Sequence, residues 1–304
     1  MLKYLIILLD DTSVSFCHYN NMRKERRLLP LDKLKEAILF AMKENLTIQM
    51  VYPDYELPQE YLNTIDTIDH SDIVPEGQKG DITVCSWDNI PNEGVVALRT
   101  TRDELFARYG EIADALNHVA RINVVITDLE QMSNADFDTY KAVLASLAKK
   151  VKDLYVEGKT PQLNILTDRL MLNTLNNCNA GWESITLAPD SKFYVCPAFY
   201  LEADGYSVGD LESGLNVKNP QLYKLDHAPI CRNCDAFQCR RCAWLNRKTT
   251  LEVNTPSHEQ CVVAHLERNA SRNLLESIRA IGVFLPEMEI PEINYLDPFD
   301  NIKQ

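Results

Sequence analysis

The sequence contains no apolar run that approaches the roughly 20 residues of a membrane-spanning helix. Its first residues, MLKYLIILLDD, also lack the basic segment and the small-residue cleavage site of a secretory signal. We therefore interpret this stretch as a buried strand, and we expect a cytoplasmic protein without membrane contacts.

Basic residues are also fewer than acidic residues. The chain of 304 residues carries 31 Lys and Arg against 44 Asp and Glu, for a formal net charge of -13. Because nucleic-acid binding relies on a basic surface that neutralises phosphates, we expect no nucleic-acid partner. A basic peptide or a basic protein surface would complement this charge better. With 45% apolar and 25% charged residues, the composition is that of a folded protein.

Cysteine is scarce in the first half of the chain, where only Cys17 and Cys85 occur, and abundant in the second. In a chain without a secretory signal, clustered thiols indicate metal ligation before they indicate disulfides. This change in composition predicts a domain boundary near residue 170. The cysteines beyond it are Cys178, Cys196, Cys231, Cys234, Cys239, Cys242 and Cys261.

The first part of the chain alternates strand and helix patterns. Thr101–Glu104 is a capping box ahead of a helix through Val119, and another helix begins near Asn134. Strand-helix units of this length imply parallel strands joined by right-handed crossovers. We expect an α/β fold in which residues 1–170 form an open or partial (β/α) barrel. Its predicted strands are Tyr4–Leu9, Thr47–Tyr52, Ile82–Trp87, Val95–Leu98, Ile122–Thr127 and Leu163–Thr167.

The second part, residues 171–284, is predicted to form a small, Cys-rich α+β domain. Ser184–Leu187 and Phe193–Val195 alternate like the strands of a hairpin, joined by the turn formers of APDSK. Irregular loops that carry CRNCDAFQCRRC follow the hairpin.

A helix closes this second part. Thr255, with Pro256 at the first helical position, marks its start, and Cys261 lies within it. The tail, residues 285–304, combines prolines with acidic residues, so we expect it to run extended.

Two Cys-x-x-Cys pairs, Cys231/Cys234 and Cys239/Cys242, suit either zinc or an iron-sulfur cluster. Zinc needs only these four thiolates and leaves the other three cysteines of this half unused. Seven thiols distributed over two cubes, four on one and three on the other, use them all. We favour two 4Fe-4S clusters and keep zinc as the alternative, because cysteine spacing alone does not identify the metal.

The segment CNAGWESITLAPDSKFYVCP, then VGDLESG, the Cys-x2-Cys-x4-Cys-x2-Cys run and a final cysteine resemble the SPASM domain. In many radical SAM peptide-modifying enzymes this domain follows the barrel and binds two auxiliary 4Fe-4S clusters. By position, the resemblance implies one cluster on Cys231, Cys234, Cys239 and Cys261 and the other on Cys178, Cys196 and Cys242.

The three-cysteine set leaves one iron of its cube without a protein thiolate. We expect water, Asp226 or His227 at this iron in the resting protein, or a thiolate of a bound peptide. Cys17 and Cys85 belong to the barrel, and we expect that they would have to reach across it.

The loop after the first strand, SVSFCHYN, resembles the radical SAM loop in which Cys-x3-Cys-x2-Cys holds the cluster that binds S-adenosylmethionine (AdoMet). Only the middle ligand, Cys17, is present, because Ser13 and Asn20 stand at the outer positions. The family's Gly-Gly-Glu segment, which contacts the AdoMet amino group, is replaced by Tyr52–Pro58, whose prolines and tyrosines prevent a glycine-like backbone approach. We expect a barrel of radical SAM type with no AdoMet-binding residues and no radical SAM activity of its own.

Nearly the whole chain is similar to the CXXX repeat peptide maturases, through LIILLDD, FCHYNN, VYPDYELP, AFQCRRCAWLN and HLERNASR. The resemblance implies a role in maturing a ribosomally synthesised Cys-repeat peptide, in a heterodimer with an intact radical SAM peptide maturase. We expect an accessory or pseudo-enzyme subunit that binds the precursor peptide, this partner or both. The alternatives are a zinc-stabilised interaction protein and an enzyme acting at its own three-cysteine cluster.

Overall fold

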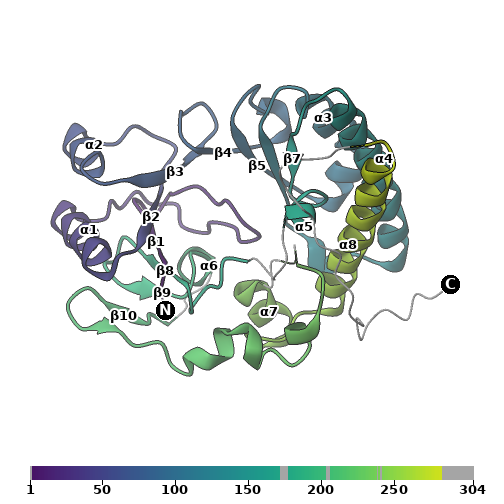
Figure 1. Cartoon of the computed structure of the whole chain (residues 1–304). Coiled ribbons are helices and arrows are strands. Elements are labelled where there is room, and N and C mark those ends of the chain that lie inside the picture. Colours follow the sequence, from purple (N-terminus) through teal and green to yellow (C-terminus); the bar gives the residue numbers. More distant parts are fainter. Residues whose placement is uncertain (1, 172–176, 203–205, 238, 240–241, 283–304) are drawn as a thin grey trace.

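The computed structural model describes residues 2–171, 177–202, 206–237, 239 and 242–282. Its main sheet has nine strands in the order β7-β6-β5-β4-β3-β2-β1-β8-β9, and all neighbours are parallel except β8 and β9. The sheet curves into an open barrel with helices on its outside (Figure 1). The strands are β1 (Tyr4–Leu8), β2 (Thr47–Val51), β3 (His70–Pro75), β4 (Ile82–Cys85), β5 (Val95–Thr100), β6 (Arg121–Ile126), β7 (Gln162–Leu163), β8 (Ser184–Leu187) and β9 (Phe193–Tyr194).

Four crossover helices connect strands of the barrel, which confirms the predicted α/β fold with a partial (β/α) barrel. In the first of them, α1, the buried residues recur at helical spacing and pack against residues of β1 and β2. A small ribbon of β10 (Gly209–Asp210) and β11 (Gly214–Leu215) follows α6. The helices are α1 (Leu31–Glu44), α2 (Gln59–Ile65), α3 (Arg102–Ala115), α4 (Asn134–Val156), α5 (Asp168–Met171), α6 (Ala198–Leu201), α7 (Ala243–Thr250) and α8 (His258–Arg279).

One strand is missing from the prediction, and two predicted strand ends need correction. The sequence pattern does not predict β3, because the first half of His70–Pro75 is polar and only its second half is buried. The strand predicted through Trp87 ends at Cys85. The strand predicted over Leu163–Thr167 stops at Leu163, since the Thr167 hydroxyl donates to the Leu163 carbonyl and accepts from its N–H, which turns the chain.

The start of the last helix also differs from the prediction. Ser257, rather than Thr255, caps α8: its hydroxyl accepts from the Gln260 N–H, and the Gln260 side chain accepts from the Ser257 N–H at 2.9 Å. Cys261 lies in the first turn of α8, as predicted. The predicted extended tail, residues 285–304, lies outside the described residues.

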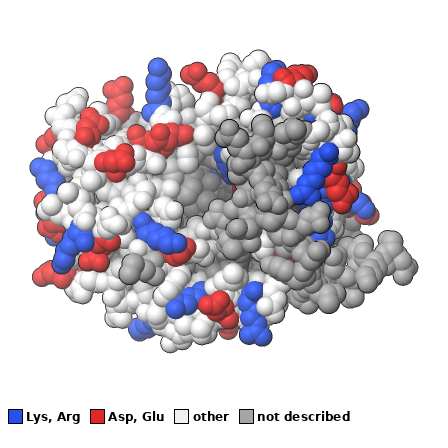
Figure 2. All heavy atoms as spheres, in the orientation of Figure 1, with Lys and Arg blue, Asp and Glu red and all other residues white. Residues whose placement is uncertain are grey.

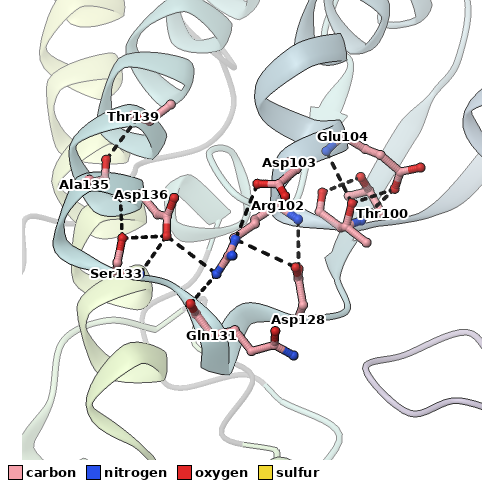
Figure 3. A network of polar contacts seen from close by, with 11 residues as sticks. Thr100, Arg102, Asp103, Glu104, Asp128, Gln131, Ser133, Ala135, Asp136 and Thr139 are labelled. Atoms are coloured by element: carbon pink, nitrogen blue, oxygen red, sulfur yellow. Dashed lines mark hydrogen bonds and ion pairs between the residues drawn. The ribbon is translucent and has the colours of Figure 1, made fainter.

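The helices that follow β5 and β6 are fixed to each other at the mouth of the barrel. Both α3 and α4 begin with a capping box, on Thr101 and Ser133. Arg102 joins the two starts (Figure 3): its N–H donates to Asp128 at 2.8 Å, and its guanidinium pairs with Asp136 at 3.6 Å. The network holds the carboxyl ends of β5 and β6 together.

The C-terminal elements pack directly on the barrel. Helix α8 lies along α4 (Figure 1), and the Tyr140 hydroxyl donates to Glu267 across the two helices at 2.8 Å. Ser271 donates to the Leu166 carbonyl at 2.6 Å. On the other side, β8 continues the sheet beside β1. These contacts place the cysteines of the second half against the barrel mouth.

Acidic side chains gather at the upper left of the face shown in Figure 2, over α2, while basic and acidic side chains mix elsewhere on this face. None of the helices in the described part combines the length and the apolar character that a bilayer-spanning helix requires.

Candidate metal centre at the barrel mouth

Ser13, at the first ligand position of the radical SAM-like loop, is completely buried. Its hydroxyl donates to the Val51 carbonyl at 2.8 Å and accepts from the Asp10 N–H at 3.1 Å. The side chain therefore ties the carboxyl end of β1 to that of β2. Both of its hydrogen-bonding directions are used within the protein.

Asn20, at the third ligand position, is bound by Arg99 of β5. The Arg99 guanidinium donates to the Asn20 side-chain oxygen at 2.9 Å and to the Tyr19 carbonyl at 2.7 Å, while its Nε donates to the Cys17 carbonyl at 3.1 Å. Burial lowers the pKa of Arg99. A cation from the sheet thus fixes the end of this loop.

Glu202, just after α6, fastens the same loop to the Cys-rich part. Its carboxylate accepts from the Asn20 N–H at 2.9 Å and from the Trp244 indole at 3.2 Å. Lys248 of α7 pairs with it at 3.5 Å. The loop after β1 is therefore held from two sides.

The segment after β2, where the family's Gly-Gly-Glu would lie, is filled by side-chain contacts. The Tyr55 hydroxyl donates to Asp10 at 2.9 Å, and the Arg26 guanidinium lies 4.1 Å from the centre of the Tyr55 ring. Pro53 is buried, and its carbonyl accepts from Gln78 at 3.0 Å. An aromatic ring and a proline thus take the space that two glycines would leave open.

Of the predicted set of Cys178, Cys196 and Cys242, the last two pack against one hydrophobic cluster, although they come from separate segments. Burial and the neighbouring thiols of Cys242 and Cys178 raise the pKa of Cys196 well above its usual value. Burial and the Cys178 thiol likewise raise the pKa of Cys242 to about 12. Cys242 also caps α7, its sulfur accepting from the Leu245 N–H at 3.4 Å. The three thiols, all among the described residues, therefore lie close enough to interact electrostatically, but they are not grouped so that they could hold one metal ion.

The other predicted set comprises Cys231, Cys234 and Cys239 of one loop and Cys261 of α8. A turn joins Cys231 to Cys234, whose N–H donates to the Cys231 carbonyl at 3.0 Å. The Cys234 sulfur lies 3.6 Å from Nε2 of His265, which is one helical turn beyond Cys261. The Cys234 sulfur therefore lies next to the face of α8 that carries Cys261 and His265.

A buried ion group holds this loop on α8. Asp235, next to Cys234, pairs with Arg268 at 2.6 Å and with Arg272 at 2.5 Å. The side chains of Asp235 and Arg268 are fully buried. Because i, i+4 and i+7 positions share one helix face, Arg268 projects from the same face as Cys261 and His265.

Sequence reasoning missed Arg99, His265 and the Asp235 ion group. For His265 a signal exists, because it follows Cys261 by four residues and so shares its helix face. For Arg99 no local signal exists, since its partners lie in the loop after β1. Among the described residues, no three His, Cys, Asp or Glu side chains are grouped so that they could hold one metal ion.

Two cavities open at this end of the molecule, on either side of the chain after the loop. One, of about 670 Å³, is lined by Ser13, Asn20, Asp54, Glu76 and Arg99 among others. The other, of about 640 Å³, is lined by residues 22–27 and by 200–202. Both include Arg23 and Lys24. Each has the volume of a small-molecule or peptide site.

No protein-family model and no curated protein matches the chain by sequence. Solved structures match by fold: a hexahistidine-tagged form of anSMEcpe with bound AdoMet has a TM-score of 0.64 at 10% identity, over 92% of this chain and 100% of that chain. Native anSMEcpe with bound AdoMet and Cp18Cys peptide has a TM-score of 0.61 at 10% identity, over the same shares of 92% and 100%. The likeness confirms the predicted partial barrel of radical SAM type, and at this identity it shows the fold alone.

Proposed function

We propose that this protein is an accessory, pseudo-enzyme subunit in peptide maturation, with auxiliary 4Fe-4S clusters and without AdoMet chemistry of its own. It binds a Cys-repeat precursor peptide and pairs with an intact radical SAM peptide maturase as a heterodimer. Residues 1–170 form the barrel unit in this proposal, and residues 171–284 form the SPASM-like unit.

The observation that carries the proposal is the state of the loop after β1. Ser13 is buried with both hydrogen-bonding directions used, and Asn20 is bound by Arg99. A cluster that binds AdoMet needs three thiolates from this loop, and it offers one. Protein contacts hold the loop in place of a cluster.

The chemistry of the remaining thiols fits iron-sulfur clusters. Cys231, Cys234, Cys239 and Cys261 would hold one cluster, and Cys178, Cys196 and Cys242 belong to the other. Thiolates are the usual ligands of such clusters, and N–H groups directed at sulfur, such as that of Leu245 at Cys242, tune their potential. When bound, the clusters supply structure and electron transfer. Phe237 and Trp244, both buried, would keep water from them.

The two cavities support the proposal that the protein binds a peptide. They share Arg23 and Lys24 in their linings, so the segment of residues 22–27 borders both of them. Native anSMEcpe, which shares the fold, has been solved with a bound peptide. An extended peptide placed here would run along residues 22–27.

The activity test is incubation of the anaerobically purified chain with AdoMet and dithionite, with an active radical SAM enzyme as the positive control. We expect no 5'-deoxyadenosine above background. Its formation by this chain alone would overturn the pseudo-enzyme assignment.

The binding test is titration of a fluorescent Cys-repeat peptide into the protein. Lys24→Ala removes an exposed cation that borders both cavities, and Lys43→Ala, on the exposed face of α1, is the matched control. We expect several-fold weaker binding for Lys24→Ala and unchanged binding for the control. Equal affinities in all three proteins would place the peptide elsewhere.

A further inference from the structure

Cys17 lies in the same packing cluster as two of the predicted cluster ligands. Its side chain, with those of Cys196 and Cys242, is partly buried against a cluster that includes Tyr19 and Trp244. The backbone at Cys17 is fixed, because Arg99 donates to its carbonyl. The loop thus holds this thiol on the side of the C-terminal cysteines.

Cavity and hydrogen-bond geometry also join the loop of Cys17 to the segment of Cys242. His18, next to Cys17, lines the same cavity as Cys242. The Asn20 N–H and the Trp244 indole donate to one carboxylate, at 2.9 and 3.2 Å. Cys17 therefore does not have to reach across the barrel to approach Cys242, which differs from the sequence-based expectation.

The other candidates for the fourth ligand are less well placed. Asp226 and His227 lie in a one-turn helix and are exposed. Cys85 ends β4 and shares a packing cluster with Cys242 but not with Cys196. Of these two barrel cysteines in the described part of the chain, Cys17 is the one that packs in the same cluster as both Cys196 and Cys242.

We propose that Cys17 supplies the fourth thiolate to the cluster of Cys178, Cys196 and Cys242. The inference rests on the proposed function, since it requires that these three cysteines hold a cluster. The surviving cysteine of the AdoMet-cluster loop then ligates a different cluster and ties the barrel to the Cys-rich part. All four irons of this cluster carry protein thiolates, so no iron is left open for a substrate thiol.

Ligation by Cys17 requires the loss of its thiol proton, as for the other three cysteines, and the protons pass to solvent. The iron and sulfide come from cluster assembly and no electron is transferred in this exchange of ligands. Aromatic side chains packed with Cys17, Cys196 and Cys242, including Tyr19 and Trp244, would limit the access of water to the site once it is filled.

The test uses the full chain, reconstituted anaerobically with iron and sulfide, as wild type, Cys17→Ala, Cys17→Ser and Cys85→Ala. Iron and sulfide per chain are measured, and EPR spectra are recorded with and without added 2-mercaptoethanol. Cys85→Ala is the matched control, because it removes the other barrel cysteine. Cys17→Ser is included in case the alanine variant folds poorly. Serine has nearly the size of cysteine and offers an oxygen ligand in place of sulfur.

We expect wild type and Cys85→Ala to hold equal iron and to show no spectral response to the added thiol. Cys17→Ala should lose about one iron per chain, because a cube with three thiolates readily releases its fourth iron, and its spectrum should respond to 2-mercaptoethanol. Cys17→Ser should keep the iron with a shifted spectrum. Iron and spectra in both Cys17 variants identical to wild type would overturn the inference while leaving the proposed clusters intact. Wild-type protein that takes up no iron would overturn the proposed clusters themselves, and this inference with them.

Discussion

Arg99 donates a hydrogen bond of 2.9 Å to the side chain of Asn20, the residue at the third ligand position of the radical SAM-like loop. The same guanidinium binds the carbonyls of Cys17 and Tyr19. An arginine of the sheet therefore orders a loop that, in radical SAM enzymes, a cluster would order.

Arg99→Ala should destabilise the protein by about 1–3 kcal/mol, because it leaves three oxygen acceptors without their charged donor. Urea unfolding of the metal-free protein measures the change. Arg108→Ala is the control: Arg108 makes surface ion pairs with Asp88 and Glu111 and lies 5.2 Å from the centre of the Trp87 ring, and we expect it to lose less than about 1 kcal/mol. Equal stability of Arg99→Ala and wild type would refute the role assigned to Arg99.

Asp235→Asn should cost about 3–5 kcal/mol, because it leaves the buried guanidinium of Arg268 without a counter-charge. The variant should also bind less iron, since Asp235 positions the loop that carries Cys234 and Cys239. Urea unfolding and iron analysis check the two effects. The exposed Asp226 provides the control, Asp226→Asn, for which neither quantity should change.

Cys85 should make stability fall with rising pH. Burial raises the pKa of its thiol from 9.0 to about 12, so the folded state keeps the proton that the unfolded state loses above pH 9. This contribution to stability is complete below pH 9 and is lost as the pH rises from 9 to 12. At pH 10 the loss is about 1 kcal/mol. Unfolding of wild type and Cys85→Ala at pH 8 and pH 10 measures it. If Cys85→Ala lost as much stability between pH 8 and pH 10 as wild type, Cys85 would not contribute to the pH dependence.

Restoring the two missing cysteines should not restore a cluster that binds AdoMet. In the double variant Ser13→Cys, Asn20→Cys, the first sulfur would occupy a fully buried position that faces the Val51 carbonyl, and Arg99 would still hold the loop. We expect no additional iron and no 5'-deoxyadenosine. A gain of about four iron atoms per chain would show that only the two ligands are missing.

Local patterns predict the barrel but not the contacts that shape its mouth. Apolar runs identify β1 and β2 because both strands are buried, whereas β3 is half polar and escapes the same reasoning. A capping box gives the start of α3, and the helix expected near Asn134 begins there as α4. The partners of Arg99 and Asp235 come from distant segments, so no local pattern predicts them. No local pattern predicts the proximity of Cys17 to Cys242 either, because it depends on how α7 packs against the loop after β1.

The central claim is that this chain has given up the AdoMet cluster and keeps both auxiliary clusters. Iron, sulfide and zinc analysis of anaerobically purified wild-type protein tests it most directly. Two 4Fe-4S clusters predict about eight iron and about eight sulfide per chain, with no stoichiometric zinc. About twelve iron per chain, or a colourless protein that contains zinc and no iron, would contradict it.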